Sequence, residues 1–260
     1  MYIDTHCHLD SKEYINNLDS VITNAIDLGL ERIVIPGANI NDLQYAIDIS
    51  EKYDIVYFAS GIHPSEIENL NEDSKSILKN ALSHSKCVAI GEIGLDYHYL
   101  DSNPSIANDT KAKQKIAFRY QIELALENSK PIIIHTRDSN DDVKAILSDY
   151  ANELNAVIFH CFGGDMNLFG FLKCPCYYGI GGIVSFKNAH SLRESLKEIP
   201  LESLLLETDA PYLSPTPHRG KTNTPEYIPL IASHLANTLQ MDINKLAAIT
   251  TMNAKSVFRF

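Results

Sequence analysis

Met1-Tyr2-Ile3-Asp4-Thr5-His6-Cys7-His8 opens the chain. Tyr2, Ile3 and Thr5 favour a β-strand, and the two-residue period of a strand directs His6 and His8 to the same face. Two unpaired imidazoles are costly to bury, whereas a bound metal ion would accept both. In isolation, the pair is better explained by one exposed histidine and one hydrogen-bonded core histidine. The rest of the chain favours the metal.

Short apolar runs alternate with longer amphipathic runs along the whole chain. The apolar runs, which we expect to be strands, are residues 2–5, 32–35, 55–59, 87–90, 132–134, 156–159, 177–180 and 204–206. Helical patterns lie at residues 21–26, 43–49, 77–82, 114–127 and 143–150 and from residue 226 onward, with a short helix expected at 168–172. Strands that are apolar on both faces, in about eight strand–helix units, predict an α/β fold of the (β/α)8 TIM-barrel type. An open doubly wound sheet is the alternative, but no GxGxxG motif follows the first strand.

The length of the chain fits one such barrel. A chain of 260 residues is close to the roughly 250 residues of a (β/α)8 barrel, and no Pro-, Ser- or Gly-rich linker divides it. Hydrophobic residues make up 45% of the chain and charged residues 21%, as expected for a globular protein with a large core. We therefore expect a single domain over residues 1–260.

Charge and cysteine content limit the class of protein. The net charge of −11 argues against a basic nucleic-acid coat protein, but it allows an enzyme that meets phosphates through metal ions and a few local cations. Five cysteines without disulfide-scaffold spacing, and no recognisable signal peptide, lead us to expect a cytoplasmic protein. No apolar run reaches about 18 residues, so no membrane span is expected. The sequence suggests no obligate protein partner.

Residues of metal-ligand type recur where the predicted strands end. They are His6, His8, His63, Glu92, His135, His160 and Asp209. In a parallel barrel the strand ends share one rim, where active sites are built. A single polar residue after a strand is ordinary, but four of these histidines with two carboxylates exceed what one structural zinc needs. The set matches two metal ions that share one carboxylate, for which Glu92 in the middle of the rim is the expected bridge.

The residues at these strand ends belong to six longer motifs, and a seventh motif follows the last of them. They are Ile3-Asp4-Thr5-His6-Cys7-His8-Leu9-Asp10, Gly61-Ile62-His63-Pro64, Gly91-Glu92-Ile93-Gly94-Leu95-Asp96-Tyr97, Ile134-His135-Thr136-Arg137, His160-Cys161-Phe162-Gly163-Gly164, Leu206-Glu207-Thr208-Asp209-Ala210-Pro211-Tyr212-Leu213 and Arg219-Gly220-Lys221-Thr222-Asn223-Thr224-Pro225. In this order they resemble the TatD family of metal-dependent deoxyribonucleases, within the amidohydrolase-like barrels. Residues 99–110 form a longer segment than is usual in that family.

The resemblance implies a specific chemistry. It implies a divalent-metal-dependent hydrolase that cleaves phosphodiester bonds of DNA, its substrate, by a metal-bound hydroxide, in an exonuclease-like manner on single-stranded or frayed ends. It also implies that His6, His8 and Asp209 hold one metal, that His135 and His160 hold the other, and that Glu92 bridges them. Imidazole and carboxylate ligands suit two divalent ions, Mg or Mn for activity, with Zn as an alternative bound ion.

Three residues are candidates for catalysis. Glu92 would hold both metals, and Asp209 could accept the proton of the attacking water. His63 could contact a substrate phosphate or transfer a proton, with a structural hydrogen bond as an equal alternative.

Arg137 and Arg219 are candidates for binding substrate phosphates, with solvated loop charges as the alternative.

Other polar and aromatic residues near the strand ends are candidates for orienting the metal ligands or contacting the substrate. Glu207 and Asp4 are expected to orient ligand imidazoles rather than to bind metal. Tyr97 and Tyr99, close to Glu92, could stack on bases, although packing is the commoner role of loop tyrosines.

Two other functions remain open from the sequence. One is hydrolysis of a small-molecule amide, lactone or ester, because neither the fold nor the metals determine which bond is cleaved. The other is a binding protein that has kept the barrel and lost catalysis, which the full ligand set disfavours. A cationic, phosphate-sized pocket beside the metals would favour the nuclease.

Overall fold

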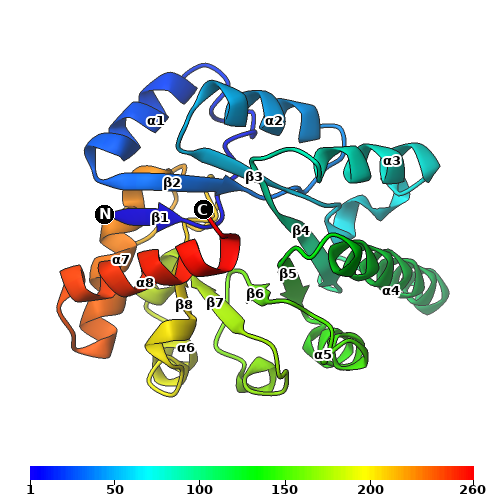
Figure 1. Cartoon of the computed structure of the whole chain (residues 1–260). Coiled ribbons are helices and arrows are strands. Elements are labelled where there is room, and N and C mark those ends of the chain that lie inside the picture. The colour runs from blue at the N-terminus through cyan, green and yellow to red at the C-terminus, as the bar shows by residue number, and fades with distance from the viewer.

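The computed structural model describes residues 1–260 and contains one sheet of eight parallel strands in sequence order, separated by helices (Figure 1). The strands are β1 (Tyr2–Asp4), β2 (Leu30–Ile35), β3 (Val56–Ser60), β4 (Cys87–Asp96), β5 (Ile132–Arg137), β6 (Val157–Phe159), β7 (Cys176–Ile180) and β8 (Leu204–Leu206). The helices are α1 (Leu18–Asp27), α2 (Leu43–Lys52), α3 (Glu72–Ala81), α4 (Pro104–Glu127), α5 (Asn140–Asp149), α6 (His190–Ser195), α7 (Ile228–Leu239) and α8 (Ile243–Phe258). The predicted (β/α)8 fold is confirmed.

The barrel closes just beyond the ends of β1 and β8. Thr5 N donates to Leu206 O at 3.0 Å, Asp209 N donates to His6 O at 2.9 Å, and His8 N donates to Ala210 O at 2.8 Å. These hydrogen bonds form the seam of the barrel, where the chain just beyond β1 meets the chain just beyond β8. The seam therefore places the two N-terminal histidines directly beside Asp209, some 200 residues later in the chain.

Apolar side chains fill the lower part of the barrel. Successive residues of each strand face opposite sides, so that Val34 packs inside while Ile33 and Ile35 pack outside under the helices. The inner cluster includes Ile3, Val34, Ala59, Ala89, Ile133, Ile158 and Leu205, together with the end of α8, which packs against β1 and β8. With this end filled, the polar residues lie at the opposite end, where the strands finish. No helix in the structure combines the length and apolar composition that crossing a bilayer requires.

Several elements differ in position or extent from the sequence-based prediction. α4 begins at Pro104, ten residues before the predicted start at Gln114, and Asn103 caps it by accepting a hydrogen bond from Ser105 N at 3.0 Å. No residue of the first three turns is buried, so apolar periodicity does not reveal them, whereas the Asn103–Pro104 start signal does. In addition, β4 continues through Glu92 to Asp96. The short helix expected at residues 168–172 does not form, and a 3-10 turn spans Met166–Leu168 instead.

The ends of β2 and β3 and the middle of β4 approach one another closely around Gly37. Its N donates to Gly91 O at 2.8 Å, and its O accepts from Glu92 N at 2.9 Å. A Cβ at this position would lie 2.5 Å from Gly61 N, which is backbone and cannot give way. Because Gly37 has no side chain, the backbone at the end of β2 can reach past β3 and hydrogen-bond to the backbone of Gly91 and Glu92.

We expect Gly37→Ala to lower the free energy of unfolding by about 1–3 kcal/mol, the usual cost of overpacking. Urea denaturation followed by circular dichroism measures this change. Gly163→Ala is the matched control, because a Cβ on Gly163 meets no atom within 4 Å. Equal midpoints for the two variants would contradict the close approach.

Candidate metal centre

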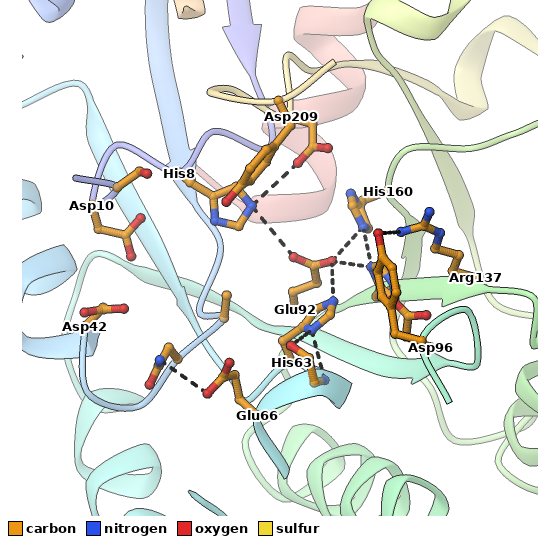
Figure 2. Close-up of a pocket in the computed structure, with 17 residues that line it drawn as sticks. His8, Asp10, Asp42, His63, Glu66, Glu92, Asp96, Arg137, His160 and Asp209 are labelled. Atoms are coloured by element: carbon orange, nitrogen blue, oxygen red, sulfur yellow. Dashed lines mark hydrogen bonds and ion pairs between the residues drawn. The ribbon is translucent and has the colours of Figure 1, made fainter. Parts of the chain in front are cut away.

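Glu92 lies at the centre of the polar end of the barrel, and histidines surround its carboxylate (Figure 2). Its Oε1 is 2.7 Å from His135 Nδ1 and 2.7 Å from His160 Nε2. Its Oε2 is 3.3 Å from His6 Nε2 and 3.9 Å from His8 Nε2. The two oxygens of one buried carboxylate therefore face two different sets of imidazoles.

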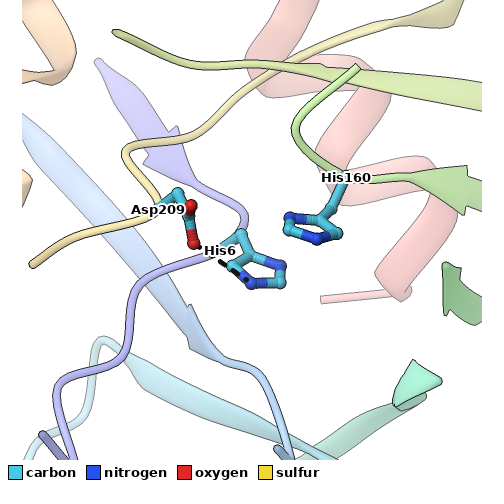
Figure 3. Close-up of side chains that lie close together, drawn as sticks. All are labelled: His6, His160 and Asp209. Atoms are coloured by element: carbon cyan, nitrogen blue, oxygen red, sulfur yellow. Dashed lines mark ion pairs between the residues drawn. The ribbon is translucent and has the colours of Figure 1, made fainter. Parts of the chain in front are cut away.

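Asp209 completes the set on the side of the seam. Its Oδ1 is 3.5 Å from His8 Nε2 and 3.7 Å from His6 Nε2. The rings of His6 and His160 are stacked, with centroids 4.0 Å apart and planes at 11° (Figure 3). In three groups of residues, the possible ligand atoms all lie within 4.8 Å of one another. The groups are His6, His160 and Asp209; His6, His8 and Glu92; and His63, Glu92 and His135.

Some ring nitrogens of these histidines have no partner in the protein and are available as metal ligands. Both ring nitrogens of His6 and Nδ1 of His160 are buried and make no hydrogen bond. Leaving such a buried atom unpaired costs about 1–3 kcal/mol. A divalent cation coordinated by imidazole and carboxylate would satisfy these atoms, so the residues present fit the metal centre that the sequence predicts.

The protonation of the side chains in this site follows from their burial and from the charges of their neighbours. Burial lowers the pKa of His6 and of His63 to about 4, so both imidazoles are neutral at pH 7, and His6 has a lone pair that no protein group uses. Burial also opposes the charged form of His8 and of His135, but Asp209 beside the first, and Asp96 and Glu92 beside the second, raise each pKa to about 9.

The pKa of Glu92 shows the same balance. Its burial opposes ionisation, yet the nearby imidazoles of His160, His63 and His6 hold its pKa well below the usual range. Glu92 is therefore an anion at every pH at which the protein is expected to work, and its two oxygens are available as ligands.

His63 enters the same site from the end of β3. Its Nδ1 lies 2.7 Å from Ser65 Oγ and accepts a hydrogen bond from Ser65 N at 3.1 Å. Its Nε2 consequently faces Glu92 Oε1, at 3.6 Å. The structure brings this residue within the group that includes Glu92 and His135, close enough to be a ligand as well as a contact for substrate.

Asp96 was not among the predicted site residues, although it contacts one of them directly. Its Oδ2 is 3.1 Å from His135 Nε2, and it orients that ring toward Glu92. The signal was present in the sequence, because Glu92 and Asp96 are four residues apart on one strand and share a face. The prediction ended the strand at residue 90 and so missed it.

The two carboxylates expected to orient imidazoles differ in what they contact. Asp4 accepts hydrogen bonds from His6 N at 3.2 Å, from Thr208 N at 3.0 Å and from Thr208 Oγ1 at 2.6 Å. It therefore holds the backbone of the seam rather than a ring, which corrects the prediction. Glu207 is fully buried beside His160, with 3.9 Å between its Oε1 and His160 Nδ1, and accepts from Cys161 N at 2.5 Å.

A cavity of about 480 Å³ opens above these residues. Arg137 is the only arginine or lysine that lines it, whereas three further carboxylates, Asp10, Asp42 and Glu66, were not predicted and line its other side (Figure 2). Arg219 does not line the cavity. Its guanidinium lies 3.7 Å from the centre of the Phe186 ring and donates to Ser214 O at 3.2 Å, which corrects its expected place. The wall is thus not the cationic pocket that would favour a nuclease.

The sequence and the structure match those of known proteins over their whole length. The family model for TatD related DNase matches residues 3–259. An uncharacterized metal-dependent hydrolase from Bacillus subtilis, YabD, is 42% identical over 100% of this chain and 99% of its own. A protein from Edwardsiella piscicida named 3′-5′ ssDNA/RNA exonuclease TatD is 33% identical over 99% of each chain.

Among solved structures, the TatD homologue YJJV from Escherichia coli K12 superposes with a TM-score of 0.90 at 27% identity, covering 100% of this chain and 98% of that one. The family model, the two relatives and this fold agree with one another and with the clustered histidines and carboxylates. The chain belongs to the TatD-related DNase family of metal-dependent hydrolases.

Proposed function

We propose that this hydrolase cleaves phosphodiester bonds of DNA, removing nucleotides from single-stranded or frayed ends with the help of two divalent cations. The observation that carries the proposal is the placement of Glu92, whose two oxygens face separate sets of imidazoles. Such a carboxylate is suited to bridging two cations, the arrangement used for displacement at phosphorus. The exonuclease name of the Edwardsiella relative supports the choice of substrate.

In this proposal His6, His8 and Asp209 would hold one cation, His135 and His160 would hold the other, and Glu92 would serve both. When bound, the cations polarise a phosphate oxygen and favour ionisation of water near neutral pH. Mg or Mn is the expected ion for turnover, with Zn as an alternative bound ion.

The protein's own groups position the reactants and move the protons. The water oxygen bonds to phosphorus as the bond from phosphorus to the leaving sugar oxygen breaks. Asp209 accepts the proton of the water. Although burial raises its pKa, hydrogen bonding to His8 and the nearby His6 and His160 lower it below the usual value, so the carboxylate is ionised. His63 Nε2 faces the cavity, where the N–H of the neutral imidazole can donate a hydrogen bond to the phosphate or to the leaving oxygen, which takes its proton from solvent water.

The test is hydrolysis of end-labelled single-stranded DNA by the purified protein in Mg²⁺ or Mn²⁺. We expect single nucleotides to be released, and we expect the Asp209→Asn protein, purified identically, to show at most background cleavage. Because the variant shares every contaminant, equal cleavage by both proteins would refute the assignment.

One observation favours a second candidate, the hydrolysis of a small-molecule amide, lactone or ester. The cavity carries Asp10, Asp42 and Glu66 on its wall and a single arginine, a composition that does not by itself select a polyanion. Turnover of lactones or amides without turnover of DNA would establish this candidate in place of the nuclease.

We expect Arg137→Ala to raise KM for DNA about 10-fold with little change in kcat, because a charged hydrogen bond to a phosphate away from the reacting atoms contributes mainly to binding. Steady-state kinetics on one oligonucleotide measures both constants. Arg219→Ala is the control, because the structure places this arginine on Phe186 and outside the cavity. A larger effect from Arg219→Ala than from Arg137→Ala would reverse the two assignments.

A further inference from the structure

Two exposed aromatic side chains stand out on the surface of this protein. Tyr99 is 80% exposed and Tyr212 is 58% exposed, while every other tyrosine and phenylalanine is buried or partly buried. Both of these residues line the cavity above Glu92. Aromatic rings displayed beside a nucleic-acid site offer stacking surfaces that any base can use.

Tyr212 lies on the side of the seam. It follows Asp209 along the chain, and its N donates to Asp209 O at 2.8 Å. Its ring meets the ring of His8 edge to face, with centroids 5.8 Å apart. This tyrosine therefore stands over the half of the site formed by His8, Asp209 and Glu92 Oε2.

Tyr99 lies on the opposite side. The guanidinium carbon of Arg137 is 5.0 Å from the centre of its ring, and Arg137 Nη1 is 3.5 Å from its hydroxyl. Arg137 in turn follows His135 by two residues on β5. Tyr99 therefore stands over the half of the site formed by His135 and Glu92 Oε1.

We propose that Tyr99 and Tyr212 stack on the bases of the two nucleotides joined by the scissile phosphodiester, so that the phosphate spans Glu92 between them. This inference rests on the proposed function and adds the way in which the substrate is held. Stacking on both flanking bases requires that they be unpaired, which provides a physical reason for a preference for single strands.

The charges around the two rings differ and orient the strand. Arg137 accompanies Tyr99 on a side whose carboxylate, Asp96, is paired with His135, whereas Asp10 and Asp42 lie on the same side of the cavity as His8, where Tyr212 stands (Figure 2). The continuing strand, with its phosphates, fits the side with the arginine. The terminal nucleoside then lies on Tyr212, and a further phosphate there would face the two carboxylates. The site thereby selects a chain end that carries a hydroxyl group.

Alanine and phenylalanine variants, assayed on oligonucleotides with and without a terminal base, test the stacking. We expect Tyr212→Ala to lower kcat/KM roughly 5- to 150-fold, the range for loss of one stacked base, and Tyr212→Phe to retain most activity. An abasic terminal nucleotide should slow the unmodified protein by a similar factor and the alanine variant hardly at all. Tyr99→Ala should likewise lower kcat/KM. An abasic site at the nucleotide next to the terminal one should slow the unmodified protein by a similar factor and this variant hardly at all.

The end selection is tested with strands ending in a hydroxyl or a phosphate. We expect the protein to prefer the hydroxyl end about 10-fold or more, and the double variant with Asp10→Asn and Asp42→Asn to lose most of this preference. If the protein cleaves DNA but the base dependence is unchanged in the alanine variants, the inference is wrong and the proposed function stands. If the protein cleaves no DNA at all, both are wrong.

Discussion

Glu92→Gln is expected to reduce kcat/KM for DNA by at least about 10³-fold while leaving the fold intact. The amide has the same shape, but it removes the negative charge and replaces one oxygen with a group that cannot bind a cation. Substitution of residues that only support ligands typically costs 10–100-fold, so loss of a shared ligand should cost more. Initial rates in saturating Mn²⁺ measure the effect, and circular dichroism with urea denaturation checks the fold.

Glu66→Gln is the matched control for this substitution. Glu66 lines the same cavity, but its carboxylate accepts hydrogen bonds from Asn39 and Asn69 at 3.4 and 3.0 Å and belongs to none of the ligand groups. We expect its activity to stay within about threefold of the unmodified protein, a difference below 1 kcal/mol. Comparable losses in the two variants would mean that cavity charge, rather than the bridge at Glu92, supports the reaction.

Removal of metal should have the second large effect. Treatment with a chelator, followed by dialysis, is expected to abolish hydrolysis, and Mg²⁺ or Mn²⁺ should restore it. Because a cation binds the folded chain alone, a concentration 100 times its Kd adds about 2.7 kcal/mol of stability, or roughly 5–10 °C in Tm for a chain of this size. Differential scanning calorimetry across a Mn²⁺ titration measures the shift. Full activity and an unchanged Tm in the metal-free protein would argue against a metal centre.

The same pattern of apolar runs predicts both the barrel and the clustering of the metal-ligand residues at one end of it. Buried parallel strands appear as apolar runs, and their ends must meet at one rim, so that His6, Glu92, His160 and Asp209 can be expected together before their distances are known. The seam that joins His6 to Asp209 through backbone hydrogen bonds requires only that the last strand return to the first.

The remaining features depend on information that apolar patterning does not contain. Asp96 was missed because the strand continues past a glycine-containing segment where the apolar run stops. Arg219 and Asp42 lie in loops, where no two-residue period determines the direction of a side chain. The acidic wall of the cavity therefore became visible only in three dimensions, as did the binding of Arg219 to Phe186.

The most direct test of the whole account is a Mn²⁺ titration of the metal-free protein followed by electron paramagnetic resonance. If Glu92 joins two cations, the chain should take up two Mn²⁺ ions whose spins are coupled, and Glu92→Gln should abolish the coupled signal. A single bound ion at saturation, with the six-line spectrum of an isolated Mn²⁺, would contradict the proposal that one carboxylate serves two metals.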